Sequence, residues 1–319
     1  METVGQRIGR CIRSAMPKAC RTCFWLLKII LPVSLLVRLL QYSGILAQVS
    51  VFLEPAFSFI GLPGETAIIF LTSVFTPLYA PMTLIASMPL TVREVTLIAL
   101  MCLVSHNLLV ECAVQSKTGS SFTGMFVLRV GMSFVIAFAV HRIMPYEGYD
   151  TIVGSAADTG VCTSLTDVFV LWIKSSLSIT LLFFVIVSAL MILHYILEEF
   201  RLLKSLSTAM APVMILFGLP RNCSFLWLVG NIVGLSYGSA IMMEQLEANK
   251  ISRRDGNLLN YHLAISHSQL EDTLIFAAIG APFLWVMLTR MVFALLVVWI
   301  KRLLTRLPRY HYADLPIKK

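Results

Sequence analysis

Long apolar runs, broken by single polar or turn-forming residues, follow one another along nearly the whole chain. Runs of about 20 apolar residues are long enough to cross a bilayer as helices. The uninterrupted runs predict six crossings, at 25–47, 94–116, 122–144, 167–197, 256–279 and 283–300. The chain is therefore predicted to be an all-α polytopic membrane protein.

Two further apolar stretches, 49–90 and 210–243, are interrupted by prolines and glycines. Such residues are tolerated at membrane depth where other protein or a water-filled cavity satisfies the freed backbone groups. We interpret each stretch as a re-entrant helical hairpin that enters and leaves on one side of the membrane. Two ordinary spans are the alternative for 49–90.

A polar segment occurs twice within this apolar background. The segment Ser-His-Asn-Leu-Leu-Val-Glu (105–111) matches Ser-His-Ser-Gln-Leu-Glu-Asp (266–272) at a shift of 161 residues, from 266 minus 105. At the same shift Arg129 falls on Arg290. Upstream, Gly-Leu-Pro at 61–63 matches Gly-Leu-Pro at 218–220, a shift of 157 from 218 minus 61. Matched polar spacing predicts an internal duplication.

The charged residues set the predicted topology. Only 13% of the 319 residues are charged, about half the share of an ordinary soluble domain. Lysine and arginine gather at both termini, which marks both as cytoplasmic, whereas 145–165 has acids without lysine or arginine and suits an external loop. Six crossings plus two re-entrant hairpins satisfy this pattern and favour the hairpin interpretation. The resulting segments are a basic amphipathic segment (1–23), a first repeat (24–144), the external loop (145–165), a second repeat (166–303) and a basic tail (304–319).

Three crossings per half make the two repeats inverted, an arrangement common in secondary transporters with a site near the midplane. Polar residues inside a membrane are costly and usually face the bundle interior. The candidates for binding a solute or ion are Ser105, His106, Asn107, Glu111, Ser266, His267, Ser268, Glu271 and Asp272, with Glu65 and Asn231 from the broken stretches. Glu65 is expected to cap a helix end or to face the cavity.

Arg129 and Arg290 are predicted to form buried ion pairs. Arg129 and Glu111 lie at similar distances from the turn 117–121, so antiparallel helices bring them to a similar depth, roughly 12–15 Å from the turn. The same arithmetic pairs Arg290 with Asp272 around Pro282. These pairs either hold helices together or bind a solute, and both interpretations stay open here.

Other function classes find no support in the sequence. No G-x-x-x-x-G-K-[ST] loop is present, so nucleotide hydrolysis is not expected. Adjacent Ser and His on one helix point about 100° apart and do not form a hydrolase pair. No cluster has metal-site spacing, and Cys20 with Cys23 is half of a zinc motif without its other half. The chain is therefore expected to be no enzyme, to need no cofactor and to bind no nucleic acid.

Several motifs resemble the Gate, or nucleoside-recognition, domain. They are Gly-Leu-Pro-Gly-Glu (61–65), Leu-Thr-Val-Arg-Glu (90–94) with the segment 105–111, and Gly-Leu-Ser-Tyr-Gly (234–238) with the segment 265–272. This domain occurs in the membrane part of the bacterial ferrous-iron transporter, in spore maturation proteins A and B and in distant relatives of concentrative nucleoside transporters. The resemblance covers about residues 45–305. It implies a helical transporter fold and makes a homo-oligomer plausible.

We therefore expect a bacterial inner-membrane secondary transporter that moves a small solute, nucleoside-like, organic anion or ion, through a midplane cavity, with protons as candidate coupling ions. The alternative is a non-transporting membrane component, whose buried ion pairs are structural. Its basic termini would dock a membrane partner protein or anionic lipid. Loss of activity on cutting the termini would favour this alternative, and loss on changing the cavity would favour the transporter.

Overall fold

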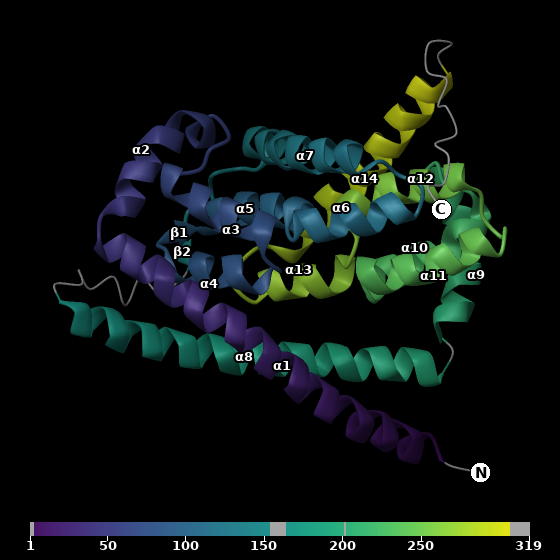
Figure 1. The fold of residues 1–319 in the computed structure, drawn as a ribbon, viewed down its shortest axis with the longest axis horizontal. Helices are drawn as coiled ribbons and strands as arrows, with labels where there is room; N and C mark the ends of the chain where they lie inside the picture. Colours follow the sequence, from purple (N-terminus) through teal and green to yellow (C-terminus); the bar gives the residue numbers. More distant parts are fainter. Residues whose placement is uncertain (1–2, 154–163, 201, 307–319) are drawn as a thin grey trace.

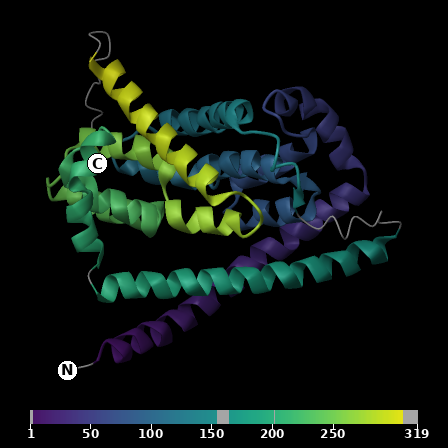
Figure 2. The same ribbon diagram turned by 180° about the vertical axis from the view of Figure 1, so that it is seen from behind.

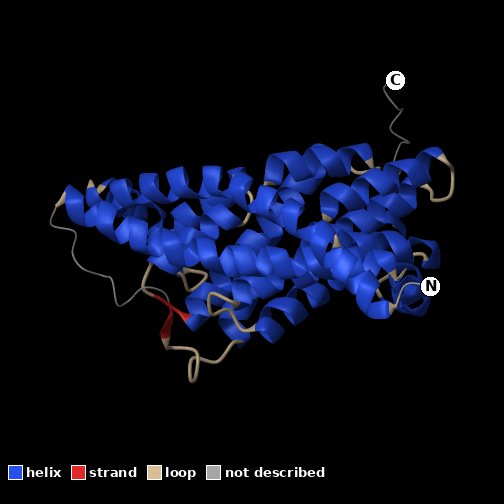
Figure 3. Ribbon diagram, turned by 90° about the horizontal axis from the view of Figure 1, so that it is seen from below, coloured by secondary structure: helices blue, strands red, loops and turns tan. Residues whose placement is uncertain are grey.

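The computed structural model describes residues 3–153, 164–200 and 202–306, and almost all of them are helical (Figures 1 and 3). A two-residue strand pair, in red in Figure 3, is the exception among these described residues. The elements up to residue 153 are α1 (Val4–Tyr42), α2 (Ile45–Ser58), a 3-10 turn (Gly64–Thr66), α3 (Ala67–Phe75), α4 (Tyr79–Ser87), β1 (Leu90–Thr91), α5 (Val92–Ser105), α6 (Leu108–Lys117), α7 (Phe122–Ile143) and β2 (Ile152–Val153).

The elements after residue 163 follow the same helical order. They are α8 (Leu165–Glu199), α9 (Leu202–Leu216), a 3-10 turn (Arg221–Cys223), α10 (Ser224–Ile232), α11 (Leu235–Glu247), α12 (Arg253–Ser266), α13 (Gln269–Ala277) and α14 (Phe283–Arg306). Even the turns correspond. Gly61 and Gly218 have φ of +78° and +71°, and each is followed by Leu-Pro and a 3-10 turn.

Helices α1 and α8 lie together along one side of the molecule, beneath the other helices in Figure 1 and in the reverse view of Figure 2. The N-terminal end of α1 lies beside the C-terminal end of α8, so the two helices are antiparallel. Helix α1 runs without interruption from Val4 to Tyr42. The structure therefore has no helix boundary at the junction of 1–23 with the first predicted span, which ends at Tyr42 instead of continuing to 47.

The two polar spans predicted at 94–116 and 256–279 are each broken in two, which corrects the sequence interpretation. Helices α5 and α6 are bent by 41° across His106 and Asn107. Helices α12 and α13 are separated by His267 and Ser268 at the matched position. Neither break contains proline or glycine, so no helix-breaking residue announces it.

Helix α5 occupies the centre of the core. All its residues from Val95 to Ser105 are buried, as expected for a helix surrounded by other helices on every side. In the described residues, α7 and α14 are long and apolar enough to cross a membrane, and α5 with α6 forms a third candidate if the bent pair is one span. The chain is thus a helical membrane protein.

The strands tie two loops together next to α5. Leu90 pairs with Val153 and Thr91 with Ile152 in antiparallel register. Thr91 also begins α5 with a capping box, in which its hydroxyl accepts from the Glu94 amide and Glu94 accepts from the Thr91 amide. Residues 154–163 of the predicted external loop and 307–319 of the predicted tail lie outside the described residues.

Candidate functional site

The two helix breaks have the same backbone geometry. His106 is extended, with φ −64° and ψ 154°, and Asn107 is left-handed, with φ 45° and ψ 36°. At the second break His267 has φ −57° and ψ 157°, and Ser268 has φ 48° and ψ 37°. Left-handed backbone is costly for residues other than glycine, and asparagine tolerates it best. Tertiary contacts must therefore hold both breaks.

Backbone hydrogen bonds from neighbouring helices provide the first of these contacts. The amide of Asn107 donates to the carbonyl of Ser73 in α3 at 2.8 Å, and the amide of Ser268 donates to the carbonyl of Gly230 in α10 at 3.0 Å. Residues 73 and 230 differ by 157, the shift of the Gly-Leu-Pro repeats. Each broken helix is therefore attached to the predicted hairpin stretch of its own half.

Arg129 and Arg290 provide the second contact, by capping the helix that ends at each break. Arg129, from α7, donates to the carbonyls of Val104 at 2.6 Å and His106 at 3.0 Å. Arg290, from α14, donates to the carbonyl of Ile265 at 2.9 Å and to that of His267. A cation at a helix C-terminus satisfies orphan carbonyls and the helix dipole. Both side chains are 0% exposed.

Glu111 is the charged centre of the site. Its Oε2 lies 2.6 Å from Nη1 of Arg129, the ion pair that the spacing predicts. Its Oε1 lies 3.1 Å from Nε2 of His106, and its Oε2 lies 3.3 Å from Nε2 of His267. Because His267 comes from the second break, this carboxylate links the two halves of the chain. Only 6% of Glu111 is exposed, so the centre is closed to solvent.

The two histidines face each other across the centre. Their Nε2 atoms are 3.4 Å apart and their rings 5.0 Å apart. Nδ1 of His106 contacts the carbonyl of Cys102 at 3.2 Å, and Nδ1 of His267 contacts the carbonyl of Leu263 at 2.7 Å. A carbonyl only accepts, so Nδ1 carries the proton in both rings and each Nε2 points into the centre.

The second predicted ion pair is absent. Asp272 and Arg290 are buried but do not come within the 4.0 Å of an ion pair, and Oδ2 of Asp272 and Nη1 of Arg290 have no hydrogen-bond partner. Arg290 spends its other donors on the break, and the shorter aspartate replaces the glutamate of the first half. The site is thus asymmetric, with Glu111 at its centre and Asp272 beside it.

The predicted small polar residues mostly bond to their own helices. Ser105 donates to the carbonyl of Met101 at 2.7 Å, and Ser266 contacts the carbonyl and the ring of His262. Asn231, at the end of α10, donates to the carbonyl of Trp227 at 2.9 Å. These three side chains are buried close to the breaks in sequence and stabilise the helices that meet there.

Two predicted acidic residues stand apart from the centre. Glu65 is exposed and makes no cap hydrogen bond. The cap at this turn is Glu54, whose Oε2 accepts from the amide of Gly64 at 2.6 Å, so the predicted cavity or cap role of Glu65 is wrong. Glu271 is half-buried and lies beside Tyr79 of α4, another contact between the two halves.

Sequence reasoning missed a buried amide that joins the halves at the other end of α6. Asn260, in α12, donates to the carbonyl of Gln115 at 3.1 Å and to the hydroxyls of Thr118 at 2.9 Å and Ser120 at 3.0 Å. A Cβ at Gly256 would lie 2.7 Å from the carbonyl of Thr118, so this approach requires glycine. A polar residue within a predicted span was the available signal.

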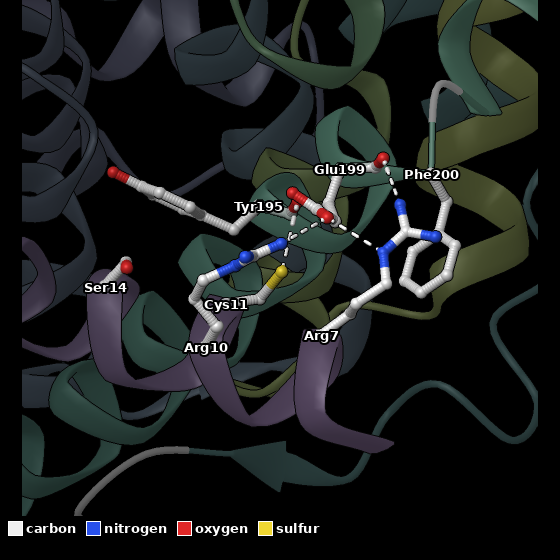
Figure 4. A pocket seen from close by; sticks show the side chains of 7 residues that line it. All are labelled: Arg7, Arg10, Cys11, Ser14, Tyr195, Glu199 and Phe200. Atoms are coloured by element: carbon white, nitrogen blue, oxygen red, sulfur yellow. Dashed lines mark hydrogen bonds and ion pairs between the residues drawn. The ribbon is translucent and has the colours of Figure 1, made fainter. Parts of the chain in front are cut away.

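A second concave region lies where α1 meets α8 (Figure 4). It has a volume of about 770 Å³. Arg7 and Arg10 converge on one oxygen of Glu199 at 2.9 and 2.7 Å, and Arg7 also packs on Phe200. The hydrogen bond from Arg7 lowers the pKa of Glu199, which lies beyond the predicted span 167–197. The charges are satisfied within the chain, so this region joins helices and is the weaker solute-site candidate.

Comparison with known proteins agrees with the membrane fold. A family model described as Gate, nucleoside recognition, matches residues 23–118, which include the first break. The uncharacterized membrane protein YvoD of Bacillus subtilis (strain 168) is 29% identical over 282 residues, covering 86% of this chain and 89% of that protein. No solved structure matches the chain. The resemblance to the Gate, nucleoside recognition, family is thus confirmed for residues 23–118.

Proposed function

We propose that this protein is a secondary transporter of the bacterial inner membrane, which moves a small solute through a site between the two helix breaks. The observation that carries the proposal is the meeting of His106, Glu111 and His267 at two broken helices in the membrane-spanning core. Broken helices place backbone groups and polar side chains at membrane depth, which is how many transporters bind solutes. The Gate match supports a transporter-related role.

The architecture that we propose has two inverted repeats, each with three crossings and one re-entrant hairpin. The pairs α3–α4 and α10–α11 are the hairpins, and α5–α6 and α12–α13 are broken spans. Matching φ values at Asn107 and Ser268, and matching arginine caps from α7 and α14, support the repeats. Both basic termini face the cytoplasm in this topology.

The buried centre represents a closed state of the proposed cycle. Opening would separate the Nε2 atoms of His106 and His267 and expose Glu111 to one side of the membrane. A nucleoside-like solute, an organic anion or an ion fits such a polar site, and the histidines or acids could pass protons.

Thermal stability in the presence of solutes tests the proposal. A ligand that binds only the folded protein raises its stability by mass action. The purified protein would be heated with nucleosides, nucleobases, organic anions and lipid-linked sugars at two pH values, beside Glu111→Gln and Asp272→Asn. We expect one class to raise the midpoint of the wild type and to lose its effect in Glu111→Gln. No shift with any class would count against a solute site.

The same capping arginines favour a second candidate, a non-transporting membrane component. Arg129 and Arg290 donate to backbone carbonyls, a structural use of the charge. In that case Glu111→Gln would lower stability without changing any ligand effect. Removal of the basic N-terminal segment would instead abolish the biological activity. The homo-oligomer and a membrane partner protein stay predictions under both candidates.

A further inference from the structure

We propose that His106, His267 and Glu111 form a binding site for one divalent transition-metal ion of the zinc or cobalt type. The three residues are buried, and one ligand atom from each lies within 4.8 Å of the others. Two ligands come from the first break and one from the second. Sequence spacing alone predicted no metal site, because His106 and His267 are 161 residues apart.

The distances between the ligand atoms fit a tetrahedral ion. Zinc bonds to imidazole nitrogen and carboxylate oxygen at about 2.0–2.2 Å, so two ligand atoms of a tetrahedral site lie about 3.3–3.5 Å apart. The structure has 3.4 Å between the two Nε2 atoms, 3.3 Å from His267 to Glu111 and 3.1 Å from His106 to Glu111. The three atoms thus need little movement to share one ion.

The protonation of the rings gives an independent reason for a cation. Because Nδ1 of each histidine donates to a backbone carbonyl, each neutral ring turns the lone pair of Nε2 toward the centre. The Glu111 carboxylate there also only accepts. Three acceptors that face one another require a cation between them, either a proton or a metal ion. The Nδ1–H bond to a carbonyl is the outer-shell contact typical of metal-bound histidine.

The arginines limit how tightly the ion binds. Nη1 of Arg129 lies 2.6 Å from Oε2 of Glu111, which orients the carboxylate but competes for its charge, and buried Arg290 adds a second cation. Oε1 of Glu111 faces His106 and is the oxygen left for the ion. We therefore expect weaker binding than in sites with thiolate or several carboxylate ligands, with borderline metals preferred over Mg²⁺ and Ca²⁺.

Metal binding is independent of the proposed transport, because it is measured on the resting protein. The full chain would be purified in detergent, treated with a chelator and titrated with Co²⁺. We expect one Co²⁺ per chain with the visible absorption of a tetrahedral ion, displaced by Zn²⁺ and not by Mg²⁺. His267→Gln and Glu111→Gln should weaken binding by at least the roughly 10–100-fold that loss of an outer-shell partner costs.

His262→Gln is the matched control. His262 is a buried histidine of α12, whose Nδ1 bonds to Ser266 and Trp227, away from the centre. It should bind Co²⁺ like the wild type. Should the ligand variants fail to fold, X-ray absorption of the Zn²⁺-loaded wild type decides, with two imidazole ligands at about 2.0–2.1 Å expected. No bound Co²⁺, or a Zn²⁺ spectrum without imidazole, would overturn the proposal and leave a proton as the central cation.

Discussion

The unequal charge pairs of the two halves predict unequal coupling energies. Glu111 and Arg129 touch at 2.6 Å, whereas Asp272 and Arg290 have no contact within 4.0 Å. A hydrogen bond to a charged group contributes about 1.5–3 kcal/mol, and coupled neighbours show interaction energies of about 0.5–3 kcal/mol. We expect a coupling near the upper end, about 2–3 kcal/mol, for the first pair. The second should be smaller by about 1.5 kcal/mol or more.

Two double-mutant cycles measure this difference. One combines Glu111→Gln with Arg129→Met, and the other combines Asp272→Asn with Arg290→Met. Both arginine variants leave two carbonyls at a break without a donor, so that loss is matched between the cycles and cancels within each. The unfolding free energy would be followed in mixed micelles with increasing SDS.

Equal coupling energies in the two cycles would refute the asymmetry of the site. Single variants with an arginine replaced by methionine are expected to be the least stable, because removing one partner of a buried pair costs about 3–5 kcal/mol. If Arg129→Met does not fold, Arg129→Lys keeps the charge and removes the planar fork of donors. It should retain part of the coupling.

A glycine, an amide and a carboxylate elsewhere give three more expectations. Gly61→Ala should lower the thermal midpoint strongly, because its Cβ would meet an imidazole nitrogen at 1.9 Å and φ is +78°. Asn260→Ala should lower the unfolding free energy by about 2–4 kcal/mol, because buried acceptors lose their donor. At low pH the ends of α1 and α8 should separate. The pKa of Glu199 is lowered in the folded protein, so its stabilisation is present above about 4.3 and is lost as the pH falls through the lowered value.

Each of these expectations has its own control. Gly131→Ala should be nearly neutral, because nothing lies within 4 Å of its Cβ, and a similar loss in both glycine variants would contradict the clash. Asn222, exposed and bonded at 3.4 Å, should tolerate alanine, and equal losses at both asparagines would argue against the buried network. Hydrogen exchange of the first turns of α1 reports the acid step. Glu199→Gln should exchange fast at neutral pH, and slow exchange there would show that the ion pair holds nothing.

The order of helices was largely predictable, because it follows from apolar runs and repeated motifs. The shifts of 157 and 161 residues aligned Gly61 with Gly218 and Arg129 with Arg290, and the structure has the same local geometry at each pair. The apolar character of 122–144 and 283–300 is sufficient to place α7 and α14. Side-chain pattern determines these elements almost alone.

The breaks were not predictable from local sequence. Asn107 and Ser268 are ordinary helix residues by composition, and a continuous helix satisfies their apolar neighbours equally well. The carbonyls of Ser73 and Gly230, together with two arginines, stabilise the broken form, and these partners lie 34 and 38 residues before the breaks, from 107 minus 73 and 268 minus 230. Tertiary hydrogen bonding thus decides the backbone here.

The candidate site was predicted in composition and not in arrangement. His106, Glu111 and His267 were all candidates, but a model with two equivalent ion pairs separates the halves. Glu111 contacts the histidines of both halves, while Asp272 contacts neither arginine at ion-pair distance. One methylene group distinguishes glutamate from aspartate, and this difference in reach is invisible to a pattern that counts only charge.

The ion pair between Arg7 and Glu199 sets the parity of the membrane crossings between them, because paired side chains lie on one face of a bilayer. Helix α1, with 39 residues, is about 58 Å long and outreaches a hydrocarbon core of about 30 Å, so its Arg7 end projects from it. With α1, α5–α6, α7 and α8 crossing once each, four crossings separate the two residues. The stretch from α2 to α4 must then return to the face it left, as a re-entrant hairpin or as two full spans. A single crossing there would place Arg7 and Glu199 on opposite faces.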